Sequence, residues 1–202
     1  MIIFVEGPRT AGKTTLIENF FKHNTNPDII YYKFYFAKYL EEFDIKKWDS
    51  GAGVHYFSIA NILTILELNE TVLKDKILVF DRSIFSAYTW SILRKRMEVE
   101  DLLSEFEKIL KSTLYHDCTL LFLTKFGDRA SKSNERVKDY FDQFEDYELE
   151  LKIFNQIIDG FKKYIVNPKK NNKYQEFVNT FDEESMVNFN ELLSNLTSVK
   201  NK

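Results

Sequence analysis

The sequence predicts an α/β fold in which a five-stranded parallel sheet is covered by helices on both faces. Three observations support this prediction. Short apolar runs typical of buried strands alternate with longer stretches of helical periodicity. A glycine-rich turn joins the first strand-like run to the first helix-like stretch, and an Asp-Arg pair directly follows a later strand-like run. Strands and helices that alternate in this way are typical of a sheet buried on both sides.

The predicted elements follow one another along the whole chain. Buried apolar runs predict strands at residues 2–5, 29–36, 77–80, 118–123 and 174–178. Apolar residues three and four positions apart predict helices at residues 13–21, 54–73, 84–97, 99–114, 145–165 and 183–196. The polar segment 125–142 has no apolar periodicity, and the chain contains no internal repeat or interdomain linker. We therefore expect residues 1–202 to form one domain.

The composition narrows the class of protein. The chain has 202 residues, of which 44% are apolar and 29% charged, and its net charge is -3. This balance provides no global positive field for tight non-specific binding to nucleic acid. Cys118 is the single cysteine, so no intrachain disulfide is expected. No apolar run is long enough to span a bilayer and no signal-peptide pattern is present, so we expect a cytoplasmic protein without a membrane anchor.

The strongest motif is "GPRTAGKT" at residues 7–14, with a predicted strand before it and a predicted helix after it. It matches the phosphate-binding pattern G-x-x-x-x-G-K-[ST] in the context that this pattern requires. The loop N–H groups and the helix N-terminus then point at phosphate oxygens. We expect Lys13 to reach the β- and γ-phosphates of ATP and the Thr14 hydroxyl to bind Mg²⁺. The nucleotide-binding residues expected from this motif are Gly7, Thr10, Ala11, Gly12, Lys13, Thr14 and Thr15.

The second motif is "VFDRSIFSAY" at residues 79–88. Asp81 and Arg82 follow a buried strand, and the carboxyl ends of parallel strands face the ligand crevice of an open sheet. We expect Asp81 to hold Mg²⁺, directly or through water, together with Thr14. Arg82 can bind a phosphate through two N–H groups at once.

The stretches "FVEGPRTAGKTT" and "DRSIFSAY" resemble the thymidylate kinase group of nucleoside monophosphate kinases. The deoxynucleoside kinases share that fold and carry a similar acid-Arg-Ser step. The resemblance is good over residues 1–22 and 54–90, loose in the lid region and the C-terminal strand and helix, and poor over 23–53. It implies a three-layer P-loop kinase fold with a small lid at about residues 125–142. It also implies transfer of the ATP γ-phosphoryl group to a pyrimidine deoxynucleoside monophosphate, with ATP and Mg²⁺ as cofactors.

The resemblance also implies residues that bind the acceptor. Counting back from Asp81 places Phe57 where the family has an aromatic residue that stacks on the base. Asn61 stands where the family has an arginine that binds the base, and this departure affects the expected preference for thymine. Arg82 is expected on the acceptor phosphate, with Glu6 and Ser86 on the acceptor side. The lid residues expected to close on the phosphates are Arg129, Lys132, Arg136 and Lys138.

Arg9 departs most sharply from the resemblance. An acid that contacts the acceptor sugar is expected at this position of the loop. The basic residue either binds the acceptor phosphate or the donor γ-phosphate, or pairs with Glu6 or another carboxylate. The sequence leaves these roles open.

Three functions remain open at this stage. The first is a deoxynucleoside monophosphate kinase that acts on a small-molecule nucleotide. The second is a kinase that acts on a hydroxyl group of a nucleoside or of modified DNA, which requires a carboxylate base such as Glu6 or Asp81. The third is a nucleotide-binding protein without acceptor chemistry, against which the Asp-Arg-Ser step and the lid both argue. The apolar stripe at 99–114 is either core or the interface of a homodimer.

Overall fold

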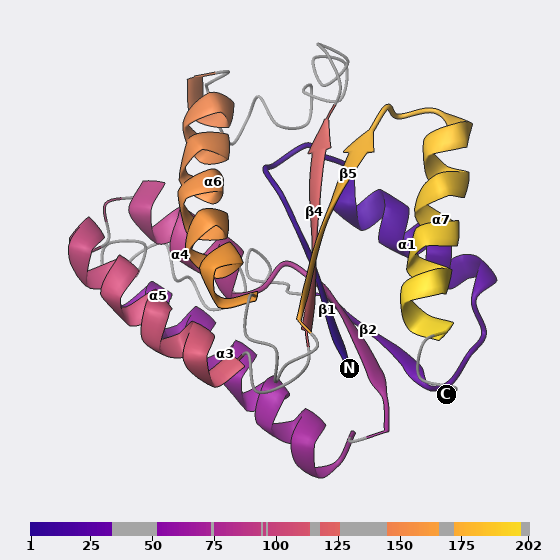
Figure 1. Cartoon of the computed structure of the whole chain (residues 1–202), viewed down its shortest axis with the longest axis horizontal. Helices are drawn as coiled ribbons and strands as arrows, with labels where there is room; N and C mark the ends of the chain where they lie inside the picture. The colour runs from indigo at the N-terminus through magenta and orange to yellow at the C-terminus, as the bar shows by residue number, and fades with distance from the viewer. Residues whose placement is uncertain are drawn as a thin grey trace.

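The five strands form one parallel sheet in the order β2-β3-β1-β4-β5 (Figure 1). This computed structural model describes residues 1–33, 52–73, 75–93, 95, 97–113, 118–125, 145–165 and 172–198. The strands are β1 (Ile2–Glu6), β2 (Ile29–Lys33), β3 (Ile77–Asp81), β4 (Cys118–Lys125) and β5 (Lys173–Asn179). The α/β fold with a five-stranded parallel sheet, predicted from the sequence, is confirmed.

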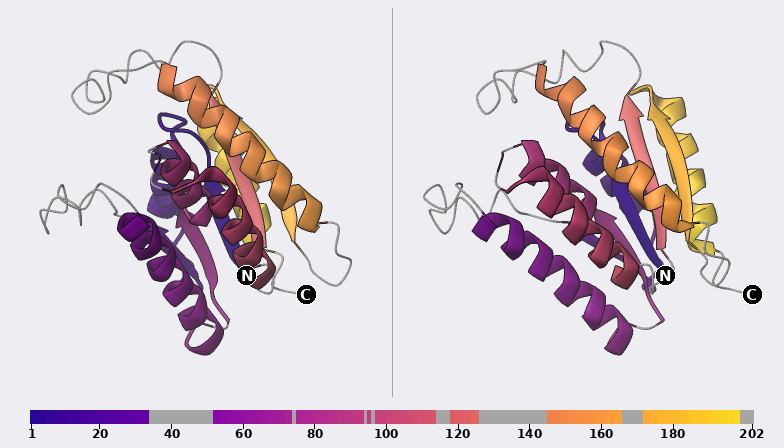
Figure 2. Two further views of the ribbon diagram at one scale, coloured as in Figure 1. Left: turned by 90° about the vertical axis from the view of Figure 1, so that its left-hand side faces the viewer. Right: turned by 60° about the vertical axis from the view of Figure 1, so that its left-hand side comes forward.

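Helices cover both faces of the sheet and complete the three layers (Figures 1 and 2). Helices α1 (Lys13–His23) and α7 (Glu183–Ser198) pack against each other on one face. The other face is covered by α3 (Ala52–Thr71), α4 (Ile84–Leu93), α5 (Val99–Thr113) and α6 (Glu145–Ile165). The predicted order of helices and strands is therefore the observed one.

The sheet divides the core into two apolar clusters, and its central strand β1 contributes side chains to both. Ile2 and Phe4 point to the face of α3, α4, α5 and α6, whereas Ile3 and Val5 point to the face of α1 and α7. Successive side chains of a strand alternate between the two faces of its sheet, so a strand buried on both faces is apolar throughout. This alternation explains why β1 reads as a continuous apolar run.

Two predicted helices differ from the structure in detail. The helix predicted at 84–97 ends at Leu93, because Lys95 adopts a left-handed φ of 48° and a helix does not continue through that conformation. In α5, Leu102 and Phe106 are buried, whereas Val99 and Leu103 of the same stripe are each 41% exposed. The core therefore uses only part of the predicted stripe. A homodimer through this helix stays a prediction.

In the part of the chain that the structure describes, no helix has the length and apolar character needed to cross a membrane.

Candidate active site

The carboxyl ends of the strands bring the predicted site residues to one edge of the sheet. Asp81, at the end of β3, lies opposite Val5 of β1 and Lys33 of β2. Glu6 ends β1 and leads directly into the glycine-rich loop. In the strand order, β2 and β3 lie on one side of β1, and β4 and β5 lie on the other side. Ligands of open parallel sheets bind where the strand order reverses in this way, so we expect the ligand outside the carboxyl end of β1.

Two glycines permit the conformation of the glycine-rich loop that follows β1. Gly7 has a φ of 143°, and a Cβ atom there would clash with the backbone carbonyl of Leu123 in β4. Gly12 has a φ of 80°, caps α1 and would clash with the Asn179 side chain. L-residues with a side chain rarely adopt these angles, so both positions favour glycine for conformation and for space. The loop is thereby held closely against β4 and the end of β5.

We expect Gly7→Ala to lower the free energy of unfolding by about 2 kcal/mol or more, because the added methyl group meets backbone at a strained φ. The matched control is Gly160→Ala in the middle of α6, where a Cβ atom meets nothing within 4 Å. The control should stabilise the chain by about 0.5–1 kcal/mol, since alanine is the better helix former. Denaturant unfolding followed by circular dichroism measures both. Equal effects of the two substitutions would contradict the packing of the loop on β4.

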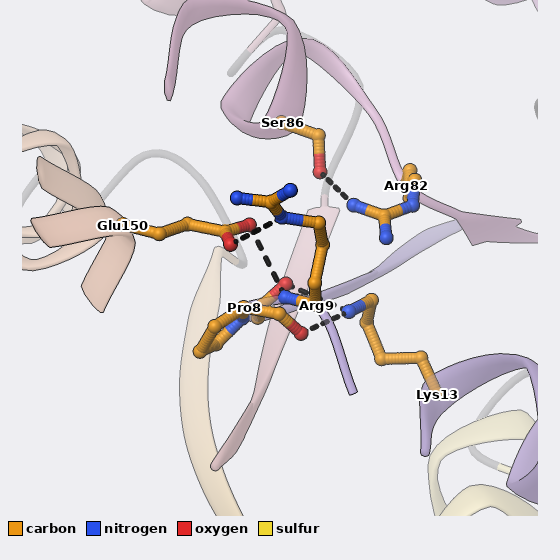
Figure 3. A network of polar contacts seen from close by, with 7 residues as sticks. Pro8, Arg9, Lys13, Arg82, Ser86 and Glu150 are labelled. Carbon is orange, nitrogen blue, oxygen red and sulfur yellow. Dashed lines mark hydrogen bonds and ion pairs between the residues drawn. The ribbon is translucent and has the colours of Figure 1, made fainter. Parts of the chain in front are cut away.

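Lys13 begins α1 and is buried in the loop. Its Nζ donates hydrogen bonds to the carbonyl oxygens of Gly7 and Pro8, each at 2.7 Å (Figure 3). Burial lowers the pKa of Lys13 to about 7, and the positive charge of Arg82 adds to this lowering. The lysine thus lies where the motif predicts it, at the N-terminus of a helix and inside the loop.

The lowered pKa of Lys13 predicts proton uptake when a nucleoside triphosphate binds. Between its lowered pKa of about 7 and its usual value of 10.5, the free chain holds Lys13 mostly neutral. Adjacent phosphate charge raises the pKa again, so binding takes up a proton and weakens as the pH rises through this range. Calorimetry of ATP binding in buffers of different ionisation enthalpy measures the uptake. Lys13→Arg should bind without it, because guanidinium keeps its proton; binding to the native chain without uptake would contradict the prediction.

Thr14, Tyr31 and Asp81 form a second polar group beside the loop. Asp81 Oδ2 accepts hydrogen bonds from the Thr14 hydroxyl at 2.5 Å and from the Tyr31 hydroxyl at 3.2 Å. Asp81 Oδ1 is buried and has no hydrogen-bond partner among the described residues. Carboxylate and hydroxyl oxygens are the hard ligands that Mg²⁺ prefers, and the unused carboxylate oxygen is available to a cation. The residues present therefore fit the predicted Mg²⁺.

Glu6 is fully buried and holds the start of α4. Its carboxylate accepts hydrogen bonds from the hydroxyl groups of Ser83 and Ser86, each at 2.6 Å, and from the Ser86 backbone N–H at 3.3 Å. Burial raises the pKa of Glu6, while the two serines and Arg82 act in the opposite direction. Ser86 Oγ also accepts a hydrogen bond from Arg82 Nη1 at 3.4 Å (Figure 3). Glu6 therefore links β1 to the Asp-Arg-Ser step, and its contact with an acceptor stays a prediction.

Arg9 pairs with a carboxylate, but the carboxylate is Glu150 of α6 and not Glu6. Arg9 Nε lies 2.9 Å from Glu150 Oε2, and the Arg9 backbone N–H donates to Oε1 at 3.1 Å. Its guanidinium carbon also lies 4.8 Å from the centre of the Trp90 ring. A phosphate-binding role for Arg9 stays a prediction alongside this ion pair.

Several predicted residues lie where the structure does not describe them. Phe57 and Asn61 belong to α3, but their side chains are outside the described part of the chain. Arg136 and the other cationic residues predicted for the lid fall between 126 and 144, also outside it. Thr10 adopts a left-handed φ of 66° within the loop, Ala11 is buried and Thr15 is exposed on α1.

Four residues at the site were not predicted from the sequence. They are Tyr31, Trp90, Glu150 and Asn179. Asn179 ends β5 and donates from Nδ2 to the carbonyl oxygen of Ala11 at 3.0 Å. The rule that selected Asp81, a polar residue at the carboxyl end of a strand, selects Asn179 as well. Glu150 carries no such signal, since it is one of several acidic residues on a helix.

Several solved structures share the fold of this chain. The chain is 15% identical to a thymidylate kinase from Candida albicans, with a TM-score of 0.54 and coverage of 100% of this chain and 93% of the other. It is 16% identical to a deoxyadenosine kinase from M. mycoides with dCMP and dCDP bound, with a TM-score of 0.56 and coverage of 98% and 100%. The fold is that of nucleoside and nucleotide kinases.

A third similar structure is the YorR protein from Bacillus subtilis in complex with phosphorylated GDP. It is 14% identical, with a TM-score of 0.56, and the match covers 99% of this chain and 97% of the other. No protein-family model and no curated protein matches the sequence. At these identities the likeness establishes the fold, and the activity must be argued from the site.

Proposed function

We propose that this protein is an ATP-dependent nucleoside monophosphate kinase. The observation that carries the proposal is the distribution of charge at the carboxyl edge of the sheet. Lys13 is bonded inside the loop, Arg9 belongs to the loop, and Arg82 contacts the same Trp90 ring as Arg9. Phosphoryl transfer needs neutralisation of charge and in-line positioning more than covalent help from the protein. Three cationic side chains beside a phosphate-binding loop suit that requirement.

Each cationic residue has a distinct part in the proposed reaction. Lys13 neutralises the β- and γ-phosphates of ATP, and the loop N–H groups orient them. Arg82 binds the acceptor phosphate. Thr14 and Asp81 hold Mg²⁺, which when bound neutralises charge on the phosphate oxygens. Arg136, in the proposed lid, supplies a further positive charge to the transferring group.

The hydrogen bonds that Glu6 and Asp81 already accept support a phosphate acceptor over a hydroxyl acceptor. A hydroxyl group must lose a proton to a base, whereas an acceptor phosphate is already anionic. Glu6 is occupied by Ser83 and Ser86, and Asp81 Oδ2 is occupied by Thr14 and Tyr31. Of the five strand ends in the described part of the chain, only β1 and β3 end in a carboxylate. This leaves little basic capacity for a hydroxyl acceptor.

Thymidylate is the first acceptor to test. The resemblance of the two motifs to thymidylate kinases and the fold shared with the Candida albicans enzyme both support a pyrimidine deoxynucleotide. Phe57 is proposed to stack on the base and Asn61 to read its edge. An amide both donates and accepts hydrogen bonds, so it can pair with the edge of either pyrimidine.

A nucleoside kinase is the second candidate. It is favoured by the remaining Asp81 oxygen, Oδ1, which is buried without a hydrogen-bond partner among the described residues and is available to accept a hydrogen bond from a hydroxyl group. The fold shared with the deoxyadenosine kinase from M. mycoides is consistent with it. Transfer to a hydroxyl group of modified DNA belongs to the same candidate.

One assay separates these functions. The protein is incubated with Mg·ATP and a panel of deoxynucleoside monophosphates, the matching nucleosides and modified DNA, and ADP release is followed. We expect turnover with monophosphates only. Turnover confined to hydroxyl acceptors would replace the proposed function with the second candidate. If none of the acceptors stimulates ADP release, we would conclude that the protein binds nucleotide without acceptor chemistry.

A further inference from the structure

Glu150 holds the loop residue Arg9 at two points. Its two carboxylate oxygens accept separately from the Arg9 backbone N–H at 3.1 Å and from Arg9 Nε at 2.9 Å. The Glu150 side chain is 0% exposed and the Arg9 side chain is 16% exposed. A carboxylate so deeply buried is costly unless it is paired and hydrogen-bonded, and Arg9 supplies both compensations. The direction of the Arg9 side chain is therefore set by α6 as well as by the loop.

Arg9 and Arg82 lie against the same aromatic ring. The guanidinium carbon of Arg9 is 4.8 Å and that of Arg82 is 5.7 Å from the centre of the Trp90 ring in α4. A cation within about 6 Å of an indole ring is attracted by the negative face of the ring. Figure 3 shows the Arg9 side chain extending from the loop between Glu150 and the Arg82–Ser86 pair.

The two guanidinium groups carry like charges against one ring, and an anion that contacts both would be attracted by both. Glu150 supplies a negative charge at the Nε edge of Arg9. A guanidinium carries five N–H donors in a planar fork, and Arg9 Nε donates to Glu150. Two guanidinium groups that contact the same ring are suited to the several oxygen atoms of a phosphate.

We propose that Glu150 is a positioning residue for the acceptor: it fixes Arg9 against Trp90 beside Arg82, so that the two guanidinium groups form one site for the acceptor's phosphate group. This inference rests on the proposed monophosphate kinase function and adds to it the residues that recognise the monophosphate. Glu150 does not touch the reacting atoms. Its effect reaches the acceptor through Arg9, so its loss should weaken acceptor binding and leave ATP binding nearly unchanged.

Steady-state kinetics of Glu150→Gln test this role. Glutamine keeps the size of the side chain but offers one acceptor oxygen to two donors, so Arg9 loses one of its two anchors. We expect the KM for the acceptor monophosphate to rise about tenfold or more, with less than about a threefold change in the KM for ATP. The matched control is Asp159→Asn, an exposed acidic residue on the same helix, which should change neither constant.

A thermodynamic cycle distinguishes positioning from simple stabilisation of the fold. If Glu150 acts through Arg9, the double variant Arg9→Ala/Glu150→Gln should have about the acceptor KM of Arg9→Ala alone. A structural role would instead change both KM values together or lower only the melting temperature. Additive effects on the acceptor KM, or an unchanged acceptor KM in Glu150→Gln, would overturn the inference.

A binding measurement keeps the test decisive if Glu150→Gln does not fold. The chain has two tryptophans, so Trp48→Phe leaves Trp90 as the single tryptophan. Titration with the monophosphate in the absence of ATP should change the Trp90 emission, and the matching nucleoside should not. Identical responses to the two ligands would overturn the inference. A failure of the proposed function is recognised by a different result: the native chain would then turn over nucleosides but no monophosphate.

Discussion

Lys13→Ala is expected to lower the kcat of phosphoryl transfer by about 10²–10³-fold, the loss typical of removing one preorganised donor from a charge-stabilising site. The reason is geometric and electrostatic. Lys13 Nζ is buried inside the loop and bonded to the Gly7 and Pro8 carbonyl oxygens, so the positive charge that it carries in the nucleotide complex lies where the terminal phosphates are expected. ADP release with the best acceptor of the panel measures the effect.

The Lys13→Ala chain should remain folded, because burial lowers the pKa of Lys13 and the charged form therefore costs the fold free energy. Lys22→Ala is the matched control, since Lys22 is exposed at the other end of the same helix. It should retain native activity. Native kcat in Lys13→Ala, with circular dichroism unchanged, would refute the assignment of the loop as a phosphate-binding site.

Asp81→Asn should lower kcat/KM by about 100-fold and raise the Mg²⁺ concentration needed for half-maximal activity. Asparagine keeps the volume and can still accept from the Thr14 hydroxyl, so the local packing is largely preserved. What is lost is the negative charge of the carboxylate, whose buried oxygen Oδ1 has no hydrogen-bond partner among the described residues. Activity measured across a range of Mg²⁺ concentrations separates a metal effect from a general loss of rate.

Asp75→Asn is the control for Asp81→Asn. Asp75 is exposed in the turn before the same strand and should leave the Mg²⁺ dependence unchanged. An Asp81→Asn chain with a native Mg²⁺ dependence would show that Asp81 does not hold the metal. Its contacts with Thr14 and Tyr31 would then be purely structural.

The sequence predicted the elements that depend on local patterns. Strand β1 reads as a buried run because both of its faces are apolar, and the turn after it reads as a phosphate-binding loop because Gly7 and Gly12 stand at the motif spacing. Asp81 was predicted at the site by one rule, that the carboxyl ends of parallel strands share an edge. The structure brings Asp81 to Thr14 although the two are separated by 67 residues.

The sequence did not predict the contacts that depend on how distant elements cross. Arg9 and Glu150 are 141 residues apart, and their pairing requires α6 to pass over the loop. Trp90 of α4 contacts Arg9 of the loop, and α4 packs directly against α6 on the same face of the sheet. Neither crossing leaves a pattern in the neighbouring residues, since helix periodicity indicates which face is buried and not which helix will cover it.

The sequence by itself therefore determined the α/β class, the order of the elements, the glycine-rich loop and the acid at the end of β3. Spacing, glycine conformation and the period of apolar residues are properties of short segments, and each can be recognised without the rest of the chain. Only the tertiary structure decided the partner of Arg9 and the shared position of Arg9 and Arg82 on Trp90. Those contacts depend on the strand order β2-β3-β1-β4-β5 and on the packing of α4 against α6, which are set by long-range contacts across the whole core.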